Sequence, residues 1–580
     1  MNIPTFDEII GQNDQIAARA EHLAKLKALI GNAYPNKFER SRVSGKEDTI
    51  SHLVEFAGQI KDKHIPVSGE GERPGDEQRE AANAELKVLG NVRASGRLAV
   101  PPRVMGKAAF VHLSDGVNRL QIYVRKQDAK AVSNDTLQTI ETENSGWDLF
   151  NLLDHGDFLG VEGFLFVTKT GELSIHVETL QFLSKAMLPM PDKIHGISDP
   201  ELQRRFRYAD LIADSLKIEH AENELTTREV FERRARLISG MRRFLDEHGY
   251  IEVETPMLTP KATGAAAKPF ETFHEALKIP LYARIAPELY LKRLTVGGFE
   301  KVYELNRNFR NEGISQKHNP EFTMLEFYCA YMDVNGMMDF AEKMIQESVQ
   351  KAVGSLTVTY FDDNKIFEVN EPKEINFEKF HRLTMREAVS QVLKKDFEYL
   401  SVQFDDSFLD DSNFLLKVYW FIKKVYSDLL SHVLKQMTSV EYSLIDKDKL
   451  EKLKSNWLEA QRIATEETEE NTLLKSNKDK LLVYIFEEAV ESELIQPTFI
   501  IDYPKSISPL SKASPQNPQT AERFELFING MECANGFSEL NDPQEQLDRF
   551  TDQMKERERG DDEAMVLDED YIRALSYGMP

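Results

Sequence analysis

Cysteine is scarce in this sequence, and the few that occur give no metal-binding pattern. Only two cysteines, Cys329 and Cys533, are found among 580 residues, and both lie in strand-like stretches. The 13 histidines are dispersed along the chain, so no Cys/His spacing suitable for a zinc site is present. We therefore expect a protein of a reducing, cytoplasmic compartment.

Long apolar runs and an N-terminal signal are also missing. No stretch approaches the roughly 18 apolar residues that a membrane-spanning helix requires. The first residues, MNIPTFDEIIGQNDQ, place acidic side chains where a secretory or transit signal needs cationic or apolar ones. The sequence therefore predicts a soluble, unexported protein without a membrane partner.

Positive charge is in deficit. The chain has 72 Lys and Arg against 97 Asp and Glu, a formal net charge of −25, which argues against indiscriminate coating of nucleic acid but allows a local basic surface. Its 41% hydrophobic and 29% charged residues are ordinary for a globular protein. Because one hydrophobic core usually stops growing at roughly 250 to 300 residues, we expect several domains.

The chain is divided into three blocks. Residues 1–91 alternate helical pieces with a polar stretch, PVSGEGERPGDEQREAANAE, and predict a helical extension with a linker. Residues 92–190 consist of short alternating runs between Gly and Asp turns, which is typical of a five-stranded OB-fold barrel. Residues 200–580 alternate amphipathic helices and strands. Within them, residues from about 400 to 480 are interpreted as a helical insertion packed on the outside.

The first helix of the third block has clear end signals. Thr226 and Glu229 form a capping box, apolar residues recur at helical spacing, and Gly249 stands where a C-cap belongs. This pattern predicts a long amphipathic helix followed directly by a strand, YIEVETP.

A predicted strand pair, VYELNRNFR and the run beginning at Phe322, carries unusual charge. A period of two puts the polar residues of the first strand on one face, namely Glu304, Asn306, Asn308 and Arg310. Arginine suits bidentate contact with phosphate or carboxylate oxygens, and Lys317 and His318 in the connecting loop would add phosphate contacts. Phe322 would stack on a planar base, and Glu326 with Tyr328 would hold an ammonium. A surface hairpin with ordinary ion pairs is the alternative.

A second hairpin, RFELFINGMECANGFSELND, places two carboxylates close together. Pairing about Asn529-Gly530 puts Glu532 opposite Phe527, and so brings Glu525 and Glu532 to one face. Hard oxygen ligands in a phosphate-handling site indicate Mg²⁺ between them, whereas a solvent-facing acidic hairpin is the alternative.

Further along the same hairpin, Asn535, Phe537 and Glu539 alternate on a strand. Strict parity places them on the face opposite Glu532. A bulge near Gly536 would bring both sets together.

Four segments, GYIEVETPML, RIAPELYLKRLTVGGFEKVYELNRNFRNEGISQKHNPEFTMLEFY, LIQPTFIIDYPKSISPLSK and the second hairpin, closely resemble the class II lysyl-tRNA synthetases. The likeness covers residues 92–390 and 480–580. It implies an α+β multidomain fold, with an N-terminal OB-fold that binds the tRNA anticodon and a catalytic domain built on a mostly antiparallel sheet flanked by helices. It also implies a homodimer formed through the first motif around Pro256.

The resemblance implies roles for individual residues. Arg310 would hold the ATP α-phosphate as the catalytic residue, and the other ATP ligands would be Glu312, Lys317, His318 and Phe322. The lysine pocket would consist of Gly264, Glu288, Glu326, Tyr328, Asn535, Phe537 and Glu539. Mg²⁺ would be bound by Glu525 and Glu532, and the anticodon of tRNA(Lys) by Arg103, Phe110, Gln121 and Glu172.

Physical reasoning on the residues agrees with a cationic substrate. A cationic side chain taken out of water needs carboxylates to offset its desolvation, and Glu288, Glu326 and Glu539 would supply them, whereas a pocket for aspartate should be basic. With L-lysine and ATP in place, no side chain need act as nucleophile. The lysine carboxylate attacks the α-phosphate in line, and the site supplies alignment and charge neutralisation.

Three points stay open at the level of sequence. The chain stops at DEDYIRALSYGMP, before the third, glycine-rich motif of the family, so we expect either a truncated sequence, a partner chain that supplies the motif, or a noncatalytic relative that binds tRNA or lysine. Phe110 alone would also suit the barrel core. A basic helix with Arg19, Lys25 and Lys27 would either touch the tRNA backbone or be a solvated face.

Overall fold

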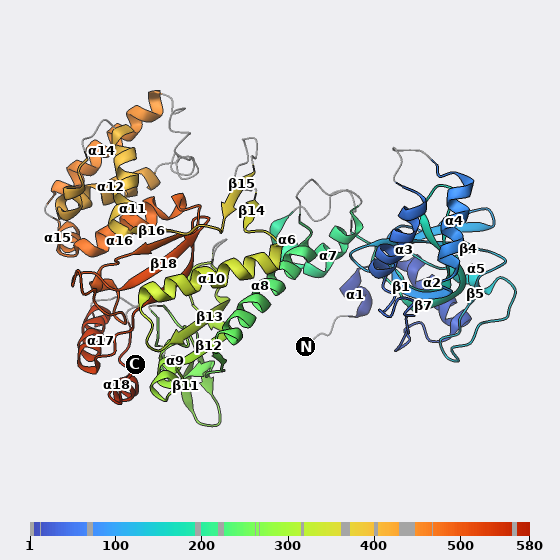
Figure 1. The fold of residues 1–580 in the computed structure, drawn as a ribbon, viewed down its shortest axis with the longest axis horizontal. Coiled ribbons are helices and arrows are strands. Elements are labelled where there is room, and N and C mark those ends of the chain that lie inside the picture. The colour runs from blue at the N-terminus through green and yellow to red at the C-terminus, as the bar shows by residue number, and fades with distance from the viewer. Residues whose placement is uncertain are drawn as a thin grey trace. The chain divides into compact units, whose positions relative to one another are not determined.

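The computed structural model describes residues 5–580 apart from residues 12, 67–72, 192–198, 218–224, 262, 266, 315–317, 361–371, 400–403, 428–446, 467 and 559–564. The chain folds into two units, Met1–Glu232 and Arg233–Pro580, whose elements are labelled in Figure 1. Within the described ranges, no helix combines the length and the apolar character needed to cross a membrane.

The first unit is built around a closed barrel. Its five long strands are β1 (Asn91–Leu98), β3 (Ala108–Ser114), β4 (Arg119–Arg125), β6 (Phe158–Val167) and β7 (Leu173–Ser184). They pair in the order β1-β6-β7-β4-β3, and β3 pairs back to β1, which closes the ring. Outward and buried residues alternate along β3 and β4, as a barrel requires. The OB-fold prediction is confirmed.

Shorter elements complete this unit. Two short strands, β2 (Arg103–Met105) and β5 (Lys130–Ala131), pair with β3 and β7. The helices are α1 (Phe6–Ile10), α2 (Asp14–Ile30), α3 (Ile50–His64), α4 (Asp76–Lys87), α5 (Ser145–Phe150), α6 (Pro200–Arg205) and α7 (Arg207–Leu216).

The N-terminal helices share the hydrophobic core of the barrel. Leu26, Leu53 and Leu86 are fully buried in one cluster with barrel residues such as Ile122 and Leu180. The polar stretch that the sequence predicts as a linker therefore contains a packed helix, α4. Ala82 and Leu86, four residues apart, provide the small apolar stripe that fixes this helix on β6.

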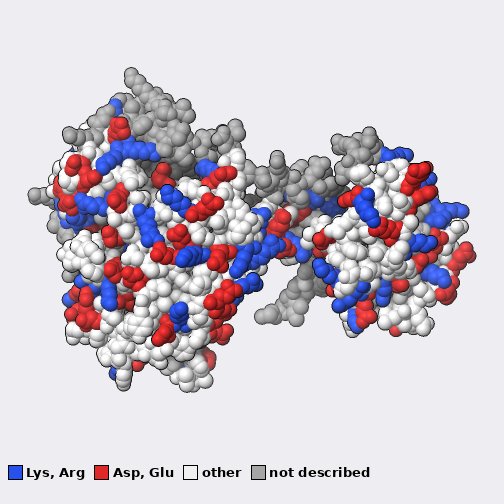
Figure 2. Space-filling model, viewed as in Figure 1, with Lys and Arg blue, Asp and Glu red and all other residues white. Residues whose placement is uncertain are grey.

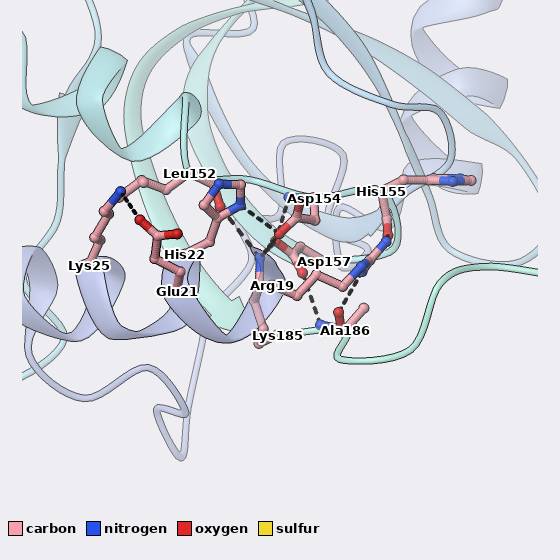
Figure 3. A network of polar contacts seen from close by, with 10 residues as sticks. All are labelled: Arg19, Glu21, His22, Lys25, Leu152, Asp154, His155, Asp157, Lys185 and Ala186. Carbon is pink, nitrogen blue, oxygen red and sulfur yellow. Dashed lines mark hydrogen bonds and ion pairs between the residues drawn. The ribbon is translucent and has the colours of Figure 1, made fainter. Parts of the chain in front are cut away.

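A buried ion-pair network, drawn in Figure 3, holds α2 to the end of β7. The Lys185 side chain is fully buried, and its Nζ lies 2.8 Å from Asp157 Oδ2 and also pairs with Asp154. His22 Nδ1 of α2 lies 2.9 Å from Asp154 Oδ2. Because one ammonium serves two carboxylates, the network is compensated only while all its members are present.

Arg19 of α2 belongs to the same contact region (Figure 3). Its guanidinium is buried and donates to the carbonyls of Ala186 and His155, at 2.5 and 3.1 Å. Lys25 instead lies exposed and pairs with Glu21 at 2.6 Å. The expectation that Arg19 is a tRNA contact or a solvated residue is therefore wrong, because its buried guanidinium is bonded to backbone carbonyls of the protein itself.

Helix α8 (Thr227–Glu247) begins and ends where its sequence signals predict. Thr226 N donates to Glu229 Oε2 at 2.8 Å, and Glu229 N donates to Thr226 Oγ1 at 3.1 Å, which is the reciprocal pair of a capping box. Gly249 follows the helix with φ of +80°, a conformation that favours glycine.

The second unit contains several small sheets. Strand β12 (Lys301–Phe309) pairs with β13 (Glu321–Cys329) antiparallel and with β8 (Ile251–Glu252) parallel. The strands β16 (His381–Thr384), β17 (Thr498–Ile501), β18 (Arg523–Ile528) and β19 (Met531–Phe537) form a second sheet in that order. The remaining strands are β9 (Leu258–Thr259), β10 (Glu271–His274), β11 (Ile279–Ala283), β14 (Thr357–Tyr360) and β15 (Lys373–Asn376).

Helices cover these sheets. They are α9 (Glu288–Val296), α10 (Val334–Val353), α11 (Met385–Tyr399), α12 (Ser412–Ser427), α14 (Lys447–Thr465), α15 (Glu469–Ser476), α16 (Lys478–Ala489), α17 (Pro543–Glu558) and α18 (Glu569–Leu575). The helices α11, α12, α14, α15 and α16 bury one core against the second sheet, and Ile485, Ile500 and Phe527 all belong to this cluster. Figure 2 shows positive and negative side chains interspersed on the visible face of each unit.

Candidate active site

The β12–β13 hairpin places Arg310 beside Phe322, as the period-two pattern predicts. Asn308 pairs with Phe322 in the register, and Arg310 N donates to Pro320 O at 2.9 Å directly after β12 ends. The guanidinium carbon of Arg310 lies 5.3 Å from the ring centroid of Phe322. Its Nε is buried and has no hydrogen-bond partner in the described part of the chain, so this cation still has a donor to offer a ligand.

The other predicted residues of this hairpin are placed less fully. Glu312 and His318 are exposed in the connecting loop, and Lys317 lies outside the described residues. Glu304, at the start of the polar face of β12, is buried and not exposed to solvent. Glu304 is 1% exposed and forms a 2.7 Å ion pair with Arg284, itself nearly as buried. Sequence reasoning did not single out Arg284.

Two carboxylates of the predicted lysine pocket, Glu288 and Glu539, form ion pairs with a lysine of the protein itself, Lys292. The Nζ of Lys292 lies 2.6 Å from Glu288 Oε1 and 2.6 Å from Glu539 Oε2. Tyr328 donates to Glu326 Oε1 at 2.6 Å. Glu288 and Lys292 are neighbours on one face of α9, so the i, i+4 spacing was the signal that would have revealed this lysine.

Burial and mutual repulsion raise the pKa of two carboxyl groups of this pocket, Glu326 and Glu539. Burial raises the pKa of Glu326 to about 8, and Glu288 and Glu539 add to the rise, while Tyr328 and Lys292 oppose it. Burial likewise raises the pKa of Glu539 to about 7 against the effect of Lys292. A further cation in this pocket would therefore gain strong electrostatic stabilisation.

Gly264 and Phe537 are the apolar part of the same pocket. Gly264 is buried with φ of +95°, and a Cβ built on it would lie 3.4 Å from Glu288 Cβ. Phe537 presents its ring 5.1 Å from Lys292 Nζ. Asn535 lies apart from these groups, opposite Glu525 in the register, with its Nδ2 3.5 Å from Glu525 Oε1.

The hairpin β18–β19 brings the two predicted metal-binding carboxylates to one face. Glu532 pairs with Phe527, as predicted, and Glu525 with Asn535. The predicted bulge is present but lies elsewhere. The register shifts between Leu526 and Phe527, opposite Cys533, whereas Gly536 pairs regularly with Phe524. A bulge at Gly536 is therefore wrong, and a Cβ there would come within 2.6 Å of the Phe524 ring.

Glu525 is held by two neighbouring side chains, while Glu532 is a weakened acid. Arg523 Nη2 lies 2.5 Å from Glu525 Oε1, and Tyr503 donates to Glu525 Oε2 at 2.7 Å. Burial raises the pKa of Glu532 to about 7, and Glu525 adds to the rise against the effects of Arg523 and Arg310. The two carboxylates and the donor chemistry fit a hard divalent cation. Arg523, two residues before Glu525 on one strand face, was missed by sequence reasoning.

Two comparisons with known proteins agree with this arrangement. The family described as tRNA synthetases class II (D, K and N) matches residues 215–580, and the OB-fold nucleic acid binding domain family matches residues 87–183. The chain belongs to the class II tRNA synthetases. The synthetase is 40% identical over 580 residues to a lysine–tRNA ligase of Thiobacillus denitrificans, with 100% of this chain and 93% of the relative covered.

Two further relatives are similar to the synthetase to the same degree. A lysine–tRNA ligase of Coxiella burnetii (strain Dugway 5J108-111) is 39% identical over 574 residues, with 99% of this chain and 92% of the relative covered. A lysine–tRNA ligase of Pectobacterium carotovorum is 39% identical over 576 residues, with 99% and 91% covered.

The barrel of the synthetase gathers the four predicted anticodon residues on one outer surface. Arg103 pairs with Phe110 in the register of β2 and β3. Gln121 Nε2 donates to Glu172 Oε2 at 2.8 Å, and His112 Nε2 lies 2.6 Å from Glu172 Oε1.

Phe110 itself is not a core residue. Its neighbours Ala109 and Val111 are buried, whereas Phe110 points outward and lies 4.8 Å from the ring of Tyr123. His112, which shares the outward face with Phe110, was not found from sequence. Its spacing of two from Phe110 was the available signal.

Proposed function

We propose that the protein is a lysine–tRNA ligase, which activates L-lysine with ATP to lysyl-adenylate and transfers the lysyl group to tRNA(Lys). The observation that carries this proposal is the pocket in which Glu288, Glu326 and Glu539 converge around buried cationic and aromatic groups. Such a pocket suits an amino acid with an ammonium side chain and repels an acidic one. The names of the relatives support the same activity.

In this proposal Arg310 is the catalytic residue. Its free Nε and its position above Phe322 suit an α-phosphate held next to a stacked adenine, with Glu312 beside the adenine and His318 and Lys317 toward the outer phosphates. The lysine carboxylate attacks the α-phosphorus in line, the P–O bond to pyrophosphate breaks, and pyrophosphate leaves. No side chain takes a proton in this step, because the attacking carboxylate is already ionised.

Glu525 and Glu532 would hold Mg²⁺ beside this centre. Desolvation, and after it the neighbouring carboxylate of Glu525, raise the pKa of Glu532, and a divalent cation would favour the ionised form of both carboxyl groups. When bound, the ion supplies charge neutralisation at the phosphate oxygens. The protein's own contribution is to fix the carboxylates, since Arg523 and Tyr503 hold Glu525 in a single orientation.

Around the amino acid, Gly264 would allow close approach of the substrate backbone, and Glu326 with Tyr328 would accept an ammonium group. Glu288, Phe537 and Glu539 complete the pocket wall, and Asn535 would connect it to the metal-binding pair.

The barrel would read the tRNA. We assign residues 92–190 to anticodon binding, with Phe110 as a stacking surface and Arg103, Gln121 and Glu172 as contacts to backbone and base edges. Residues 1–91 would be an extension of this unit. The catalytic domain would span residues 200–580, with residues from about 400 to 480 as a helical insertion.

A homodimer would cover an apolar surface near Pro256. Large apolar residues that flank Pro256 in sequence and are exposed are Ile251 and Leu258. Exposed apolar surface of this kind marks protein interfaces, and a second copy of the chain fits the family. We also propose that the enzyme works in the cytoplasm, where the thiols of Cys329 and Cys533 would stay reduced.

Calorimetry with free amino acids tests the proposed substrate. The full chain is expected to bind L-lysine in the micromolar to millimolar range and L-aspartate at least about 100-fold more weakly, because one buried unpaired carboxylate costs several kcal/mol. Lysine-dependent pyrophosphate exchange is the second readout. Equal or tighter binding of aspartate would refute the proposal.

The affinity for lysine is expected to depend on pH through Glu326. Below its raised pKa of about 8, this carboxyl holds a proton that must leave before an ammonium binds. The groups that face it are Glu288 and Lys292 of α9, Tyr328 of β13 and Glu539. The dissociation constant should therefore rise by up to about tenfold per unit as pH falls from 8 to 6. A titration that shows a constant affinity over this range contradicts the assignment.

A further inference from the structure

Lys292 is the most deeply buried cation of the pocket, and the proposed reaction leaves it without a role. Its side chain is 0% exposed, and its Nζ bridges two elements that are far apart in sequence, α9 through Glu288 and the segment after β19 through Glu539. The Phe537 ring lies 5.1 Å from the same ammonium. One carboxylate from each element therefore pairs with the same ammonium group, that of Lys292.

The ammonium stays charged in this environment. Burial opposes its charge, but Glu288 and Glu539 overcome that effect and raise the pKa of Lys292. In turn Lys292 opposes the rise in the pKa of Glu326 and of Glu539. The cation thus acts on all three carboxylates of the pocket.

The count of charges shows what this resident ammonium provides. Three ionised carboxylates crowded in a buried site cannot all stay ionised without a counter-ion, because like charges at short range force protonation of one of them. With Lys292 the pocket carries a net charge of −2 when fully ionised. Free lysine carries two ammonium groups, whose two positive charges neutralise the charge of −2 in the pocket. The carboxylate of the substrate is then available to Arg310.

We propose that Lys292 is a positioning residue for the amino-acid substrate, whose buried ammonium holds the carboxyl groups of Glu288 and Glu539 in place so that they are prepared for the substrate ammonium groups. This inference rests on the proposed lysine–tRNA ligase function. The ammonium does not touch the reacting atoms. It acts through the carboxylates, and its loss should change the affinity for lysine rather than the contacts to ATP.

Two variants separate the charge of Lys292 from its bulk. Lys292→Met keeps the length of the side chain and removes the charge, and Lys292→Arg keeps the charge. In calorimetry on the full chain at pH 7, Lys292→Met is expected to raise the dissociation constant of L-lysine at least about tenfold, and Lys292→Arg by about threefold or less. The affinity for ATP should stay within about twofold in both.

The pH dependence of lysine affinity provides a second readout, which would not change if Lys292 had only a packing role. Without Lys292 the pKa values of Glu326 and Glu539 rise further, so the pH below which lysine affinity falls should shift upward by about one unit in Lys292→Met and remain near the wild-type value in Lys292→Arg. A matched control is Lys555→Met, which removes an exposed helical lysine paired with Asp552 at 2.8 Å and should alter neither readout.

The outcomes decide between the roles. A dissociation constant for Lys292→Met within twofold of wild type overturns the proposal, as does equal weakening in the Met and Arg variants, which would indicate a packing role. If Lys292→Met does not unfold cooperatively above the assay temperature, Lys292→Gln replaces it with the same expected values. Failure of the wild-type chain to bind lysine would refute the proposed function itself, and is thereby distinguished from failure of this inference.

Discussion

Arg310→Ala is expected to slow lysine-dependent pyrophosphate exchange by roughly 10³-fold, because a positioned cation at a transferring phosphoryl group contributes about this much. The buried Nε of Arg310 has no hydrogen-bond partner in the described part of the chain, so the substitution removes a donor that is available to a ligand. Lysine affinity should change by less than about tenfold, since the pocket carboxylates stay in place.

The matched control for this experiment is Arg307→Ala on the same strand. Arg307 is half exposed, and its only described ion pair is a 3.6 Å contact with Glu321, which contributes little at the surface. Exchange in this control should stay within about twofold of wild type. A rate for Arg310→Ala close to that of Arg307→Ala would remove Arg310 from the catalytic role.

Lys185→Met is expected to destabilise the first unit by about 3–5 kcal/mol, because it leaves the buried carboxylate of Asp157 without its ion-pair partner and Asp154 with His22 alone. Asp157 is fully buried, and burial already raises its pKa against the opposing effect of Lys185. Hydrogen exchange of α2 and β7 in the full chain measures the loss, since it reports local opening without assuming a single transition for both units.

Lys25→Met provides the comparison on the helix that this network anchors. Its ammonium pairs with Glu21 while both side chains are more than half exposed, so the change in stability should lie within about 0.5 kcal/mol. If protection of α2 and β7 were equally unaffected in Lys185→Met, the network would not be what holds α2 on the barrel.

Local patterns predicted much of this fold because neighbouring residues decide them. The capping box at Thr226, the turn at Asn529-Gly530 and the pairing of Phe527 with Glu532 depend on spacings of a few residues, and each is confirmed. The outward direction of Phe110 follows from strand alternation in the same way, once the barrel is formed.

The missed features are those that join distant segments. Lys292 meets Glu539 across 247 positions of sequence, a pairing that no local period reveals. Arg19 lies in a basic stretch that is typical of a nucleic-acid contact. Its guanidinium nevertheless donates to backbone carbonyls at the end of the barrel, more than 130 residues away in sequence. Tertiary packing decides both cases, because it places Lys292 against a carboxylate and Arg19 against backbone carbonyls of distant segments.

The extra residue of β19 at Cys533 has a consequence for how this hairpin tolerates change in length. Glu532, on the tip side of the bulge, and Asn535, on its root side, both lie on the strand face that carries Glu525, although the two are an odd number of positions apart. Removing one residue at the bulge would restore regular pairing of β18 with β19. It would also turn one of these two side chains to the opposite face of the sheet. A regular ladder would therefore separate Glu532 and Asn535, and the proposed site depends on the extra residue that the strand carries.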